Sequence, residues 1–78
     1  MKIEIFGPGC SKCNSLEKTV KEAVSELNLA AEVVKISDIG QMVERGVMLT
    51  PALFVDGNKI LEGRVPNLEA IKKILKGE

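Results

Sequence analysis

Short strand-like runs and longer amphipathic stretches alternate along the chain, and this order leaves few folds open. Lys2–Phe6 is strand-like and ends at a Gly-Pro-Gly break. Apolar residues then recur at helical spacing over residues 11–28, with charged residues on the other face. Residues 31–36 form a second strand-like run. Because a crossover of helical length separates the two runs, we expect two parallel strands.

A short second helix is predicted next. It begins at the Ser37-Asp38 pair, where Gln41 stands three residues after Asp38 as in a capping box, and it ends at Gly46. Its predicted apolar stripe consists of Ile39, Met42 and Val43. We expect this stripe to face the core.

The last third of the sequence predicts a hairpin followed by a helix. Ala52–Val55 and residues 59–62 flank an Asp-Gly pair, which is typical of a tight turn between antiparallel strands. Asn67 is a plausible N-cap for the final helix. The order βαβαββα predicts an α/β fold with a mixed four-stranded sheet flanked by helices. At this length we expect residues 1–78 to form one domain.

Two cysteines, Cys10 and Cys13, stand where the first strand-like run gives way to the first helix. If the helix begins at Cys10, its unpaired N–H groups point at that sulfur and stabilise a thiolate. Cys13 would lie one turn further along on the same face, close enough for a disulfide. Lys12 adds a positive charge that should lower the pKa of the Cys10 thiol. The pair can therefore cycle between dithiol and disulfide.

Other readings of the two cysteines remain open. Both could be unrelated buried small hydrophobes. Paired cysteines also begin thiolate metal sites, but the sequence has no histidine and no third cysteine. A closed site would then need carboxylate help or a dimer in which two chains share a metal or a cluster. We expect no metal and no other cofactor in a single chain.

Composition argues against several classes of partner. Eleven basic and eleven acidic residues give a formal charge of zero, and Phe6 and Phe54 are the only aromatic residues. Neither nucleic acid nor an anionic membrane is therefore expected to bind. No apolar stretch approaches membrane-spanning length, and the first apolar run is too short for a signal peptide. We expect a cytoplasmic monomer, in which a CxxC pair is more plausibly catalytic or metal-binding than structural.

The CxxC at the start of the first helix, with Thr50-Pro51 just before the third strand, resembles the thioredoxin-like superfamily. The chain is most similar to the small thioredoxin-like redox-active disulfide proteins of archaea and bacteria. The resemblance implies a thiol–disulfide oxidoreductase in which Cys10 is the nucleophile and Cys13 the resolving thiol. It also implies a cis Pro51 and a Thr50 backbone that pairs with the substrate. Partners would be a disulfide-bearing protein and an upstream reductase.

The sequence offers further candidate site residues. Ser11 and Lys12 replace the Gly-Pro of thioredoxins and the Pro-Tyr of glutaredoxins, and we take them as supporting residues. Glu4 lies six residues before Cys10, where thioredoxins place a buried carboxylate that handles the resolving thiol's proton. An exposed strand glutamate is the alternative. We expect Pro8 and Leu49 to join Thr50 and Pro51 in binding substrate.

Two departures bear on function. Glutaredoxins usually have a Gly-Gly followed by an acidic helix start that holds glutathione, whereas this chain has Arg64, Val65 and Pro66 after Gly63. Dependence on glutathione is therefore not expected. A redox-inert module that binds partners in a groove beside Pro51 stays a third alternative.

Overall fold

The structure, a computed structural model, describes residues 1–9 and 11–77. Its element order is the βαβαββα order predicted above. The elements are β1 (Lys2–Phe6), α1 (Ser11–Glu26), β2 (Glu32–Ile36), α2 (Ile39–Glu44), β3 (Ala52–Val55), β4 (Asn58–Glu62) and α3 (Leu68–Lys76). In the described part of the chain, no helix is both long and apolar enough to cross a bilayer.

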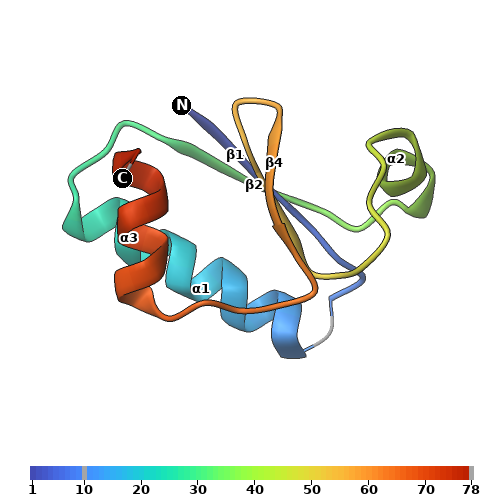
Figure 1. Cartoon of the computed structure of the whole chain (residues 1–78), viewed down its shortest axis with the longest axis horizontal. Helices are drawn as coiled ribbons and strands as arrows, with labels where there is room; N and C mark the ends of the chain where they lie inside the picture. Colours follow the sequence, from blue (N-terminus) through green and yellow to red (C-terminus); the bar gives the residue numbers. More distant parts are fainter. Residues whose placement is uncertain (10, 78) are drawn as a thin grey trace.

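The four strands form one mixed sheet, as predicted, and their order in it is β2-β1-β3-β4. β1 pairs in parallel with β2 and antiparallel with β3, and β3 and β4 form the hairpin. Helix α1 is the crossover between the two parallel strands (Figure 1). Phe6, the last residue of β1, pairs with Ala52, the first residue of β3. The segments that follow β1 and precede β3 therefore leave the sheet at the same end.

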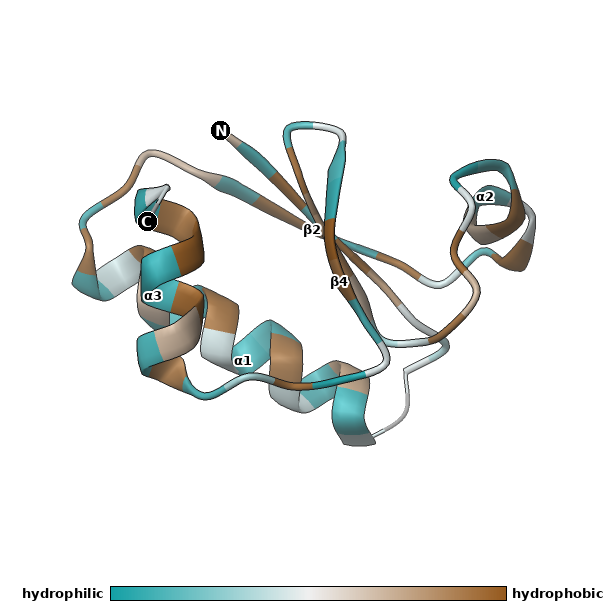
Figure 2. Ribbon diagram, viewed as in Figure 1, coloured by the Kyte–Doolittle hydropathy of each residue, from teal (hydrophilic) through white to brown (hydrophobic). Residues whose placement is uncertain are grey.

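One face of the sheet is covered by α1 and α3, which pack side by side (Figure 1). In Figure 2 both helices alternate between hydrophobic and hydrophilic bands, as amphipathic helices do. Ile3 and Ile5 of β1 are fully buried in this core. The cluster also contains Leu16, Val20, Ala23, Leu53, Leu61, Ile71 and Leu75. Burial of each large aliphatic side chain here contributes about 1.5 to 3 kcal/mol.

The opposite face is covered only in part, by the six-residue helix α2. Its Met42 packs with Phe6, Ala52 and Phe54 in a second, smaller cluster. Ile39 and Val43 are 70% and 71% exposed, so the predicted apolar stripe of this helix is wrong except for Met42. A helix this short touches the sheet with one turn only, which leaves its other apolar side chains in solvent.

Two predicted helix starts are confirmed. Asp38 caps α2, where its Oδ1 accepts a hydrogen bond from the Gly40 amide at 3.0 Å. Asn67 caps α3, where its Oδ1 accepts from the Ala70 amide at 2.9 Å. Each cap satisfies an amide that has no partner within the helix.

Candidate functional site

Cys13 is fully buried in the first turn of α1, against the end of β1. Gly7 makes this contact possible, because a methyl group at that position would lie 2.1 Å from the Cys13 sulfur. The Gly7 amide also donates to the Ile36 carbonyl oxygen at 2.9 Å, which ties the end of β1 to β2. The chain therefore needs glycine here to bring β1 and the Cys13 sulfur together.

Cys10, the predicted nucleophile, lies outside the described residues. Its role and its distance from Cys13 therefore stay predictions. Ser11 begins α1, and both Ser11 and Lys12 are exposed. Their supporting role stays a prediction.

Asn14 links this region to the sheet, a contact that sequence reasoning missed. Its Nδ2 donates to the Gly9 carbonyl oxygen at 3.4 Å, and its Oδ1 accepts from Lys35 Nζ at 2.7 Å. Lys35 belongs to β2. The asparagine therefore connects the loop after β1 with the neighbouring strand across the first turn of α1.

The Thr50–Pro51 peptide bond is cis, as the resemblance predicted. Pro51 is buried, whereas Thr50 and Leu49 are exposed. The Pro51 carbonyl oxygen accepts from the Gly63 amide at 2.8 Å. Because β1 and β3 are antiparallel and paired at Phe6 and Ala52, this segment emerges at the same end of the sheet as the exposed Pro8.

A shallow groove of about 490 Å³ lies beside the first turn of α1. Its lining residues are Ser11, Lys12, Ser15, Gly63, Arg64 and Val65. Lys12 and Arg64 are its charged residues, so the groove carries positive charge. Leu49 lies next to the lining residue Gly63, since a methyl group on Gly63 would lie 3.1 Å from Leu49 Cδ1. Ser11, Lys12 and Leu49 thus border one surface, although they are far apart in the sequence.

Glu4 is 5% exposed, so the alternative of an exposed strand glutamate is wrong. Arg45 Nη1 and Nη2 donate to its two carboxylate oxygens at 3.0 and 2.8 Å. The Arg45 guanidinium also stacks 4.7 Å from the Phe54 ring centroid and 5.3 Å from that of Phe6. These hydrogen bonds lower the pKa of Glu4 more than burial raises it.

The position of Glu4 favours a structural role over proton transfer. Along β1 it alternates with Ile3 and Ile5, so it points to the face opposite the one that α1 covers. Cys13 lies on α1. A carboxylate held as an anion by Arg45 is also a weak proton acceptor at neutral pH.

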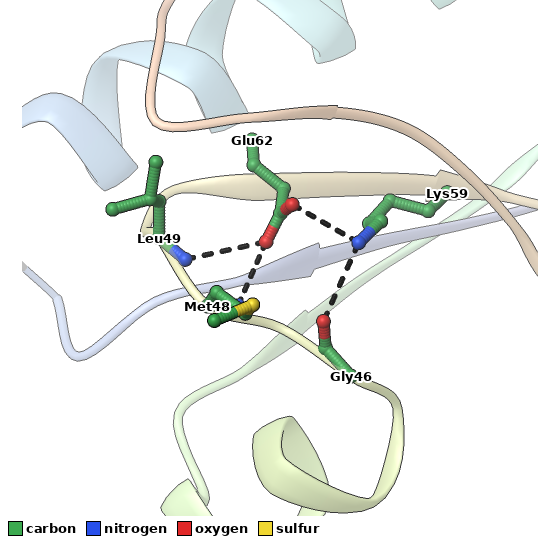
Figure 3. A network of polar contacts seen from close by, with 5 residues as sticks. All are labelled: Gly46, Met48, Leu49, Lys59 and Glu62. Atoms are coloured by element: carbon green, nitrogen blue, oxygen red, sulfur yellow. Dashed lines mark hydrogen bonds and ion pairs between the residues drawn. The ribbon is translucent and has the colours of Figure 1, made fainter.

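Glu62 of β4 holds the loop before Pro51 (Figure 3). Its Oε2 accepts from the amides of Met48 and Leu49 at 2.7 and 3.2 Å. Its Oε1 accepts from Lys59 Nζ at 3.0 Å, and the same ammonium donates to the Gly46 carbonyl oxygen at 3.4 Å. The hydrogen bonds, that of the Met48 amide first, lower the pKa of Glu62 to about 2.

Sequence reasoning missed this network because a strand irregularity creates it. Residues three apart on a regular strand point to opposite faces. Here the register of the hairpin shifts between Leu53 and Phe54, so that Lys59 pairs with Phe54 and Glu62 with Ala52. Phe54 and Ala52 share a face, and Lys59 and Glu62 therefore do as well. The sequence carries no sign of such a bulge beyond its Asp-Gly turn.

Within residues 1–9 and 11–77, no group of three or more histidine, cysteine or acidic side chains could hold a metal ion. The described residues therefore offer no complete metal site of their own. The metal-bridged dimer expected as an alternative depends on both cysteines and is not tested by this observation.

Comparison with known proteins identifies the family. The model of the thioredoxin domain family matches residues 1–76. A thioredoxin of Methanothermobacter thermautotrophicus is 49% identical over 75 residues, which cover 96% of this chain and 97% of that protein. A thioredoxin of Methanocaldococcus jannaschii is 45% identical over 74 residues, with coverages of 95% and 85%. The chain therefore belongs to the thioredoxin family and is a thiol–disulfide oxidoreductase.

Proposed function

We propose that this chain reduces protein disulfides with Cys10 and Cys13 as its dithiol. The observation that supports this most is the burial of Cys13 in the first turn of α1, packed against Gly7. The cis Thr50–Pro51 segment emerges at the same end of the sheet. A resolving thiol suits a buried position, because a bulky substrate cannot reach it directly.

The reaction consists of two exchanges. The Cys10 thiolate attacks one sulfur of the substrate disulfide, which breaks the S–S bond, releases one substrate thiolate and leaves a mixed disulfide. The Cys13 thiolate then attacks the Cys10 sulfur, forms the Cys10–Cys13 disulfide and releases the second substrate thiolate. Two electrons pass from the chain to the substrate, and two protons from solvent complete the substrate thiols. An upstream reductase returns two electrons and restores the dithiol.

The start of α1 would favour the attacking thiolate. The helix has 16 residues, and the amides of its first turn have no partners within it. Their partial positive charge, together with the exposed Lys12, stabilises an anion nearby. Ser11 adds a hydroxyl group at the first helical position.

The substrate would bind in an extended conformation beside Thr50. Addition of a peptide strand to the Thr50 backbone supplies main-chain hydrogen bonds. Leu49, which is 62% exposed, and Pro8 offer apolar contacts on either side. Pro51 itself is buried. The cytoplasmic location and the monomeric state stay predictions.

Two serine variants test this mechanism. With a disulfide-bonded protein substrate, Cys13→Ser should accumulate a covalent mixed disulfide through Cys10, because the resolving step is missing. Cys10→Ser should neither reduce nor trap the substrate. Electrophoresis without reductant and peptide mass mapping identify the linked cysteine. A mixed disulfide through Cys13 in the Cys10→Ser variant would contradict the assigned roles.

The same preparations address the metal-binding alternative. Stoichiometric bound metal, together with a dimer that dissociates when either cysteine is replaced, would support a metal- or cluster-bridged dimer. We expect the purified protein to contain no metal and to reduce disulfides once a reductant has restored its dithiol.

A further inference from the structure

Within the loop from Gly46 to Thr50, Val47 packs against the cluster around Phe6 and Phe54, whereas the next two residues are largely exposed. Met48 is 86% exposed and Leu49 is 62% exposed. Burial of their side chains therefore contributes little to fixing the backbone of this loop. Yet Thr50 and Pro51 follow directly, and strand addition requires their backbone to keep one orientation.

Polar contacts from β4 hold the backbone at Met48 and Leu49 instead. One oxygen of Glu62 accepts from two successive amides, those of Met48 and Leu49, and the other accepts from Lys59 Nζ (Figure 3). Such charge-assisted hydrogen bonds are stronger than neutral ones. Lys59 Nζ also donates to the carbonyl oxygen of Gly46, at the start of the same loop. The loop is therefore bound to β4 at Gly46, Met48 and Leu49.

We propose that Glu62 is a positioning residue that holds the loop 46–50 in the conformation that presents Thr50 and Pro51 to the substrate. This inference rests on the proposed function. Glu62 acts through the loop and need not touch the substrate. Glu62 orders the loop before the substrate arrives. The entropy lost on ordering the loop therefore does not weaken substrate binding.

The Gly63 amide provides a second link between β4 and this segment. It donates to the Pro51 carbonyl oxygen at 2.8 Å, directly after Glu62 in the chain. Adjacent residues of β4 and its following turn thus hold the backbone on both sides of Thr50. Loss of the Glu62 contacts should loosen Met48 and Leu49 and leave Pro51 in place.

Glu62→Ala is the variant that tests the proposal, with Glu22→Ala as a matched control. Glu22 is exposed on α1. Its replacement by alanine removes the same charge from a residue that does not contact the loop 46–50. For Glu62→Ala we expect KM for a protein disulfide to rise about three- to tenfold at unchanged kcat, because ordering of the loop then accompanies binding. The rate with a small aromatic disulfide, which needs no strand pairing, should stay unchanged.

Amide exchange gives a readout that does not depend on activity. In Glu62→Ala the Met48 and Leu49 amides should exchange at least about tenfold faster, while the amides of β3 keep their protection. Glu62→Gln retains an acceptor oxygen, and Lys59→Met retains both amide bonds. Both should therefore show smaller rises in KM than Glu62→Ala. These two variants also serve if Glu62→Ala does not fold.

The outcomes separate the two proposals. If the unaltered protein reduces disulfides and KM is the same in Glu62→Ala and Glu22→Ala, the positioning role is wrong. An equal loss with protein and small disulfides would also overturn it, because that pattern indicates general damage. If the unaltered protein reduces neither substrate, the proposed function itself fails, whereas the exchange measurement still decides whether Glu62 orders the loop.

Discussion

Gly7 is the residue at which fold and chemistry depend most directly on each other. A methyl group there would lie 2.1 Å from the Cys13 sulfur and 3.0 Å from its Cβ. No side chain larger than hydrogen fits between β1 and α1 unless the helix moves. Burial of the Cys13 thiol therefore depends on glycine at position 7.

Gly7→Ala should accordingly destabilise the protein by about 1 to 3 kcal/mol, because overpacking forces the helix or the strand to shift. Removal of the sulfur should relieve part of this clash. The free energy lost on Gly7→Ala, measured by urea unfolding of the reduced protein, should therefore be smaller in a Cys13→Ala background. Equal losses in both backgrounds would show that the clash with sulfur is not the cause.

Glu62 should give the protein a specific sensitivity to acid. Its pKa falls from an ordinary value of 4.5 to about 2 on folding, chiefly through the Met48 amide. The lowered pKa stabilises the folded state fully above pH 4.5, and this stabilisation is lost as the pH falls toward 2. The melting temperature should fall less steeply over this interval in Glu62→Gln. Parallel curves for the two proteins would contradict the assignment.

At the scale of the element, the strands and long helices follow from sequence pattern, whereas short and irregular pieces do not. Period-two and helical spacings are local, so β1, α1 and β3 could be predicted directly. Whether Ile39 and Val43 are buried depends on how much of the sheet α2 covers. A local sequence pattern does not contain that information. The Lys59–Glu62 pair depended on a bulge in the hairpin.

The site was predictable to a similar extent. Spacing singled out Cys10 and Cys13 as candidates, a prediction that stays untested, and the family resemblance predicted the cis bond at Pro51, which is confirmed. Glu4 was found as a candidate, but its partner Arg45 lies 41 residues away and could not be inferred from a pattern. Contacts between distant segments are settled by packing and leave no local signal.

Helix α3 offers a test of how much a single cap contributes to an element. Asn67→Ala removes the acceptor of the Ala70 amide and should lower the free energy of unfolding by about 1 kcal/mol. Asn58→Ala, an exposed change in β4, is the matched control and should cost less. Chemical denaturation at neutral pH measures both. A larger loss for Asn58→Ala would show that the cap is not what holds the start of α3.

At the scale of the whole molecule, the two faces of the sheet differ in role. The face under α1 and α3 contains the larger apolar core and supports Cys13. The other face contains the smaller cluster around Phe6 and Phe54, whose rings lie 4.9 Å apart, with the ion pair of Arg45 and Glu4 beside it. We therefore expect a substitution of Glu4 to change the stability of the folded protein without changing proton transfer at Cys13.

Glu4→Gln should therefore destabilise the protein by about 1 to 3 kcal/mol, because Arg45 loses a charged acceptor in a partly buried setting. It should leave the pH dependence of mixed-disulfide resolution unchanged, because Glu4 points away from the face that α1 covers. Stopped-flow measurement of the resolving step across pH, at a temperature where the variant is folded, tests this. A carboxylate that handled the Cys13 proton would instead shift that pH profile and slow resolution in Glu4→Gln. In that case the side of the sheet that Glu4 occupies would not be enough to separate it from the chemistry.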